Sequence, residues 1–216
     1  ALDKISEATT NADLAVIKEN SVSTLLVKAE TELAANNPSA ALLAATKALS
    51  IDANSTEALV QSALANIALK DTKAAIQSLN EAAMTDPANL YARMIRAYVN
   101  SNTPDNAKEA IIEYGRIGNT LDPETFRDVT YKALAQCLAG KKLDADETMK
   151  RAIREKENKT KDDYYLAAVY YAQTGDLATG KEMIDKAVSL GYQNLYNIYT
   201  NKTANLNIAP LRHILK

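Results

Sequence analysis

Small and large apolar side chains recur every three or four residues between Tyr164 and Leu190. They fall into two segments separated by Gly175-Asp176, and this spacing is typical of helices with one buried face. Glycine after one helix and aspartate before the next are ordinary capping residues. The stretch therefore predicts a helix–turn–helix unit. The residues that carry the pattern are Tyr164, Ala167, Ala168 and Tyr171 in the first helix and Gly180, Ile184, Ala187 and Leu190 in the second.

The same pattern recurs in weaker form along most of the chain. A shift of 34 residues superimposes Leu25 on Leu59, Ala29 on Ala63 and Ala41 on Ala75. A period of this length is typical of stacked helix pairs, each of which buries its apolar face against the next pair. We predict one domain of 216 residues, with an N-terminal cap over 1–20, five repeats over 21–191 and a C-terminal cap over 192–216.

The prolines provide independent evidence for the helix boundaries. Proline is accepted in the first turn of a helix, where its missing N–H sacrifices no hydrogen bond. Four of the five prolines follow a residue that can cap a helix, whereas Ala209-Pro210 lacks the cap. The four pairs stand where the repeat predicts that a helix begins: Asn37-Pro38, Asp86-Pro87, Thr103-Pro104 and Asp122-Pro123.

The unit at Tyr164–Leu190 resembles a tetratricopeptide repeat, because its large, small and turn residues stand at the positions that this family uses. The resemblance implies an all-α fold, an α-solenoid formed as a right-handed superhelix of about five antiparallel helix pairs with capping helices. It also implies a non-enzymatic scaffold that binds a protein, a peptide or a helix on its concave face.

The first four repeats depart from the family pattern in their first helices. Lys28, Ser62, Arg96 and Lys132 stand where the family usually has a large apolar residue, so the apolar stripe is displaced by one position. Either these helices are rotated by about 100° relative to the standard repeat, or the turns after them are one residue shorter. We favour the shorter turn, because the interval from residue 33 to 41 is one residue less than that from 171 to 180.

Composition argues against several other classes of function. A net charge of −2 and a pI near 5.6 disfavour a nucleic-acid binder, whose pI usually exceeds about 9. A single cysteine, Cys137, and a single histidine, His213, exclude a disulfide framework and a histidine-based metal site. No apolar run approaches the roughly 20 residues of a membrane span, so we expect no integral membrane segment.

No catalytic constellation is visible in the sequence. The preferred interpretations are a surface histidine for His213, a buried thiol for Cys137 and helix-capping carboxylates for Asp162-Asp163. Common nucleotide-binding motifs do not occur. The basic residues from Lys141 to Lys161 alternate with acidic ones, which favours a solvated helix face over a site for an acidic partner. We therefore predict no enzymatic activity, no cofactor and no metal.

All eleven tyrosines, from Tyr91 to Tyr199, and the only phenylalanine, Phe126, lie in the second part of the chain. Most are expected in the core, but tyrosine is also frequent in binding hot spots. Most inward positions are apolar or small, so the Lys, Arg and Asn clamp with which some relatives grip a C-terminal carboxylate is not expected. The candidate partner-binding residues on the concave face of repeats three to five are Tyr91, Met94, Tyr98, Arg127, Tyr131 and Tyr165.

Two alternatives to a peptide-binding scaffold stay open. The many Asn and Thr residues suit an exported bacterial protein, which would hold a glycan or a cell-wall fragment on its aromatic residues. The chain begins at Ala1 without a methionine, so a signal peptide before it is a related expectation, and a periplasmic or otherwise exported location is slightly favoured over a cytoplasmic one. The other alternative is self-association through the alanine-rich N-terminal half.

Overall fold

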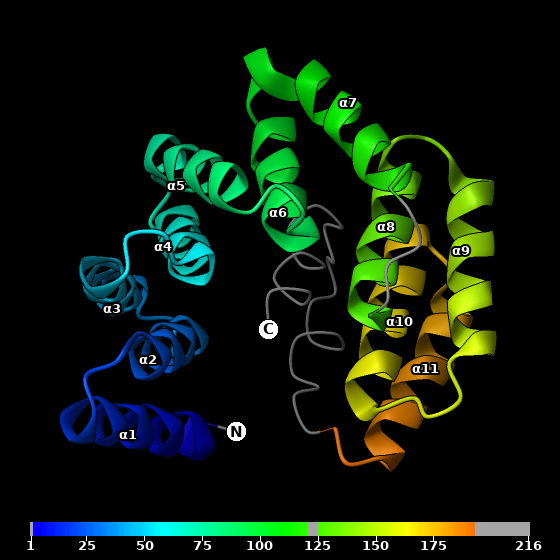
Figure 1. Ribbon diagram of the computed structural model, residues 1–216. Helices are drawn as coiled ribbons and strands as arrows, with labels where there is room; N and C mark the ends of the chain where they lie inside the picture. The colour runs from blue at the N-terminus through cyan, green and yellow to red at the C-terminus, as the bar shows by residue number, and fades with distance from the viewer. Residues whose placement is uncertain (1, 121–124, 193–216) are drawn as a thin grey trace. The chain divides into compact units, whose positions relative to one another are not determined.

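The computed structural model describes residues 2–120 and 125–192, and every regular element in these two ranges is a helix (Figure 1). The chain divides into two compact units, Ala1–Ala107 and Lys108–Lys216. The predicted all-α class is confirmed. The helices are α1 (Leu2–Lys18), α2 (Val22–Ala34), α3 (Pro38–Ile51), α4 (Thr56–Ala68), α5 (Thr72–Thr85), α6 (Leu90–Ser101), the 3-10 helix η1 (Pro104–Asn106), α7 (Ala107–Gly118), α8 (Phe126–Leu138), α9 (Lys142–Glu155), α10 (Lys161–Thr174) and α11 (Leu177–Ser189).

The first unit is a stack of helix pairs. Helices α2 and α3 pack together, as do α4 and α5, while α1 packs on α2, α3 on α4 and α5 on α6. Alanines form the contacts within the first pair, where fully buried Ala29 of α2 meets Ala44 and Ala45 of α3. Because an alanine side chain ends at Cβ, it lets two helix backbones approach closely. Helix α1 stands where the N-terminal cap was predicted.

The second unit repeats the arrangement with two more pairs. Helix α8 packs on α9, α10 packs on α11, and α8 also packs directly on α10. Where α11 crosses α10, a Cβ on Gly180 would lie 3.4 Å from the carbonyl oxygen of Ala168 and 3.4 Å from the amide nitrogen of Ala172. This is close backbone approach, and it explains why a glycine occupies the position in α11.

Neither explanation offered for the displaced apolar stripe is correct. The second helix starts sixteen residues after the first in the pairs α2/α3, α4/α5, α8/α9 and α10/α11 alike. In all four pairs the residue two positions before the second helix is left-handed: Asn36 (φ 63°), Lys70 (φ 65°), Gly140 (φ 83°) and Gly175 (φ 87°). The turns are therefore equally long and the helices share one register, so Ala168 is the position in α10 that matches Ala133 in α8.

The polar residues in the displaced stripe have a structural role instead. Lys132 of α8 donates from Nζ to the carbonyl oxygen of Thr120 at 2.6 Å, and Gln136 donates from Nε2 to that of Gly118 at 3.2 Å. In the first unit Lys28 of α2 pairs with Asp13 of α1. These side chains reach back to the segment that precedes their own helix, and the face that the family fills with apolar residues is here partly hydrogen-bonded.

The prolines confirm part of the boundary prediction. Pro38 begins α3 and Pro104 begins η1. The prediction for Pro87 was wrong, because α6 begins three residues later, at Leu90, and Asn89 caps it by accepting a hydrogen bond from Ala92. Pro123, Pro210 and the predicted C-terminal cap beyond Tyr192 lie outside the described residues.

The glycines of α7 provide a matched test of the packing of α7 on α8. A Cβ on Gly118 would lie 2.9 Å from Cγ of Gln136 and 3.4 Å from its backbone, whereas a Cβ on Gly115 would meet nothing within 4 Å. We predict that Gly115→Ala raises the free energy of unfolding by about 0.5–1 kcal/mol, and that Gly118→Ala lowers it by about 1–3 kcal/mol. Urea unfolding followed by circular dichroism measures both; equal effects would contradict this packing.

Candidate functional site

A capping box and an ion pair hold the start of α10. Thr160 and Asp163 exchange hydrogen bonds, from Thr160 N to Asp163 Oδ2 at 2.8 Å and from Asp163 N to Thr160 Oγ1 at 3.2 Å. Lys156, just after α9, also contacts Asp163 Oδ2 at 2.8 Å. Burial alone would raise the pKa of Asp163, but the bonds from Lys156 and Thr160 outweigh it and lower that pKa. The carboxylate thereby ties α10 to the end of α9.

One side of α10 faces α11, the second helix of its own pair, and another faces α9, the second helix of the preceding pair. The backbone of α10 at Ala168 faces α11, where Gly180 lies against the carbonyl oxygen of Ala168. Tyr170 points to α9, where its hydroxyl donates to Asp146 Oδ1 at 2.7 Å. Successive helical residues are rotated by about 100°, so Val169 lies between these two directions and faces neither helix. Tyr165 stands one turn before Val169 on the same side.

Helix α8 has an equivalent side. Because α8 and α10 share one register, Leu134 corresponds to Val169 and Tyr131 to Leu166. We call the sides of α8 and α10 that face away from α9 and α11 the first-helix surface. The residues that define it are Arg127, Tyr131, Leu134, Tyr165 and Val169.

Most of the first-helix surface is buried within the single chain. Tyr131 is 1% exposed and Val169 3%, and only Arg127 is exposed. Leu166 of α10, which corresponds to Tyr131, is 6% exposed. The position that corresponds to Tyr131 and Leu166 in the first unit is Val27 of α2, which is 51% exposed. The side chain at this position of the first helix is therefore exposed on α2 and buried on α8 and α10.

Tyr192 packs against this surface at Tyr165. Gly191 adopts a left-handed conformation (φ 89°), and the amide of Tyr192 donates to the carbonyl of Ala187 at 2.9 Å, which ends α11 and reverses the chain. The Tyr192 ring then stacks on the Tyr165 ring, with centroids 4.4 Å apart and planes 19° apart. Burial raises the pKa of both phenols, that of Tyr192 to about 12, and the Tyr165 hydroxyl donates to that of Tyr192.

The six predicted partner-binding residues divide equally between the two units. On α6 of the first unit, Tyr91 and Tyr98 are half-buried and Met94 is fully buried. Arg127, Tyr131 and Tyr165 all lie on the first-helix surface of the second unit. Leu134 and Val169 were among the apolar inward positions that the sequence indicated. The position of Tyr192 against Tyr165 was not indicated, because it depends on the chain reversal at Gly191.

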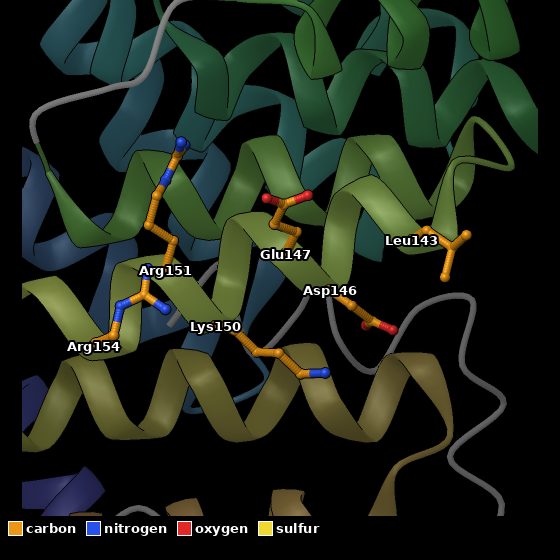
Figure 2. Close-up of a pocket in the computed structure, with 6 residues that line it drawn as sticks. All are labelled: Leu143, Asp146, Glu147, Lys150, Arg151 and Arg154. Atoms are coloured by element: carbon orange, nitrogen blue, oxygen red, sulfur yellow. The ribbon is translucent and has the colours of Figure 1, made fainter.

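The basic run of the sequence lies along α9. A cavity of about 320 Å³ is lined by residues of this helix, and Figure 2 shows their side chains. Asp146 accepts a hydrogen bond from the Tyr170 hydroxyl, and Arg154 forms an ion pair with its neighbour Glu155 at 3.7 Å. Two of the charged side chains that line the cavity therefore already have partners within the protein. The lining residues are Leu143, Asp146, Glu147, Lys150, Arg151 and Arg154.

The other candidate groups of the sequence offer no second site. Cys137 is half-buried in α8, and burial raises the pKa of its thiol, which disfavours the reactive thiolate. Within residues 2–120 and 125–192, no three His, Cys, Asp or Glu side chains gather as a metal site would require. The helices in the same ranges include none that is long and apolar enough to cross a bilayer. His213 lies outside the described residues.

Solved structures resemble this chain over most of its length. A tetratricopeptide repeat protein from Parabacteroides merdae ATCC 43184 aligns with a TM-score of 0.58 and 18% identity, covering 99% of this chain and 79% of its own. A thermophilic TPR protein from Thermus thermophilus aligns with a TM-score of 0.57 and 16% identity, covering 91% and 100%. This chain has a tetratricopeptide-repeat fold. No family model matches its sequence, and no curated relative was found.

The tyrosine pair predicts a loss of stability at alkaline pH. A phenol whose pKa is higher in the folded state stabilises that state fully below the unfolded value of 10.0, and this contribution is lost as the pH rises toward about 12 for Tyr192. We expect the urea midpoint to fall between pH 10 and pH 12, and Tyr192→Phe to make the fall shallower, because a phenyl ring has no proton to lose. An equal slope in the variant would show that the pair does not contribute.

Proposed function

We propose that this protein is a non-enzymatic scaffold that binds a peptide or a helix of another protein through α8 and α10, the first helices of its fourth and fifth repeats. The first-helix surface carries this proposal. It includes Tyr131, Tyr165 and the exposed Arg127, and tyrosine and arginine are frequent in binding hot spots.

The chemistry of these helices suggests the kind of ligand. Tyrosine combines a flat apolar ring with a hydroxyl that can donate or accept a hydrogen bond, and arginine can pair with a carboxylate or a backbone carbonyl. The residue of these helices that is most accessible to a ligand is the exposed Arg127 on α8. A segment with spaced apolar side chains and an acidic residue would suit this combination.

Peptide display followed by fluorescence anisotropy tests the proposal. We predict that this protein selects peptides of one sequence class, and that Arg127→Ala weakens their binding about tenfold, which corresponds to about 1.4 kcal/mol. Leu143→Ala is the matched control, because this leucine is 84% exposed on α9, away from the first-helix surface. Circular dichroism confirms that each variant is folded.

Two outcomes would contradict the proposed function. One is that no peptide class is enriched above background. The other is that Leu143→Ala weakens binding as much as Arg127→Ala does, which would place the ligand on α9 instead.

A further inference from the structure

Helix α7 carries an apolar patch on its exposed side. Ile111 and Ile112 are 57% and 55% exposed. A Cβ on Gly115, one turn further along, would meet nothing within 4 Å, so the backbone there is open. Helical residues three and four positions apart lie side by side, and these three residues therefore adjoin. We call Ile111, Ile112 and Gly115 the α7 patch.

The packing of α7 uses the opposite side of the helix. The buried residues there are Ala110, Tyr114 and Ile117. An amphipathic helix with one buried face ordinarily presents polar residues on its other face. Contiguous exposed apolar groups on that other face are typical of an interaction surface.

Helices α3, α5, α9 and α11 carry mostly polar residues at the positions of the α7 patch. Fully buried alanines at the fourth position align α3, α5 and α9 with α7: Ala41, Ala75, Ala145 and Ala110. In this alignment Gly115 corresponds to Thr46, Asn80, Lys150 and Asp185. Ile112 corresponds to Leu43 in α3 and to Gln77, Glu147 and Glu182 in the other helices. The two isoleucines together with the glycine therefore distinguish α7.

Two opposite charges flank the α7 patch. Glu109 lies in the first turn of α7 and Arg116 in the last, and both are exposed. They are seven residues apart, so they lie within about 20° of each other around the helix axis. Arg116 contacts Glu113 of its own helix at 3.6 Å and still leaves 68% of its side chain exposed. One flank of the patch is therefore acidic at one end and basic at the other.

This charge pattern is complementary to itself. In an antiparallel pair of identical helices related by a two-fold axis, the same flank of each copy faces its equivalent in the other copy. When Glu109 opposes Arg116 of a second copy, the axis passes beside Ile112, and the same ion pair forms twice. Gly115 then lets the two backbones approach each other closely.

We propose that the α7 patch binds the α7 patch of a second copy of this chain, with the two helices antiparallel. The proposal goes beyond the proposed function, because it uses no residue of the first-helix surface. The patch also differs from the alanine-rich N-terminal half, through which the sequence suggested self-association. Only two half-exposed isoleucines contribute from each copy, so we expect a weak dimer with a dissociation constant of roughly 100 µM.

Sedimentation velocity of the full chain between about 10 µM and 1 mM tests the proposal. The weight-average mass should rise with concentration from the 23.4 kDa of one chain toward twice that value. Ile112→Ser should raise the dissociation constant at least about tenfold. Leu43→Ser is the matched control, because Leu43 is 58% exposed at the same position of α3, and it should leave the dissociation constant unaltered.

Mixing two charge variants tests the antiparallel arrangement. Glu109→Arg gives a copy with arginine at both flanking positions, and Arg116→Glu gives a copy with glutamate at both. Each variant should repel itself and dimerise about tenfold more weakly. In an equimolar mixture every arginine faces a glutamate, so association should return to within about threefold of the unsubstituted chain. A role of these charges within one chain, such as an interaction with the helix dipole, could not be restored by mixing.

Circular dichroism verifies that each variant is folded, which is expected because every substituted side chain is exposed. A chain that stays monomeric at about 1 mM would overturn the proposal. A dimer that Ile112→Ser weakens no more than Leu43→Ser does would overturn it too, because another surface would then hold the copies together. A mixture no tighter than the separate charge variants would have the same consequence. The proposed function would survive each of these results, since it depends on peptide binding by α8 and α10.

Discussion

The close approach of paired helices through small residues is the constraint on which the rest of the structure depends. Ala29 against Ala44 and Ala45, and Ala168 against Gly180, bring two backbones together with no large side chain between them. Such contacts gain dispersion energy along the whole crossing and leave no room for a larger residue. Larger side chains must therefore point elsewhere, either to the preceding segment or to the side of the first helix that no second helix covers.

The two remaining directions have different chemistry in this chain. Toward the preceding segment, Lys132 and Gln136 donate hydrogen bonds to backbone carbonyls, which holds α8 against the end of α7. On the first-helix surface, α8 and α10 carry the buried Tyr131, Tyr165 and Val169. Polar side chains thus take part in holding α8 to the segment before it, in addition to the apolar contacts within the pairs.

The sequence was sufficient to predict the helices and their pairing, because alanine spacing and turn residues are local signals. It failed at Pro87, which stands in a connection that Asn89 closes, since a capping residue and a proline together suit a turn as well as a helix start. The explanation of the displaced stripe from the sequence was also wrong. Hydrogen bonds such as that of Lys132 to Thr120 join residues far apart in sequence, so they produce no periodic pattern that a sequence could reveal. The stacking of Tyr192 on Tyr165 was beyond prediction for the same reason.

The central claim is that the first-helix surface of α8 and α10 binds a partner. Methyl NMR on a selectively labelled chain tests it most directly, because Leu134 and Val169 lie on this surface while Leu143 and Leu177 are exposed on α9 and α11. Adding a selected peptide should shift the methyl resonances of Leu134 and Val169 and leave those of Leu143 and Leu177 in place. Shifts confined to Leu143 and Leu177 would contradict the account and move recognition to the second helices.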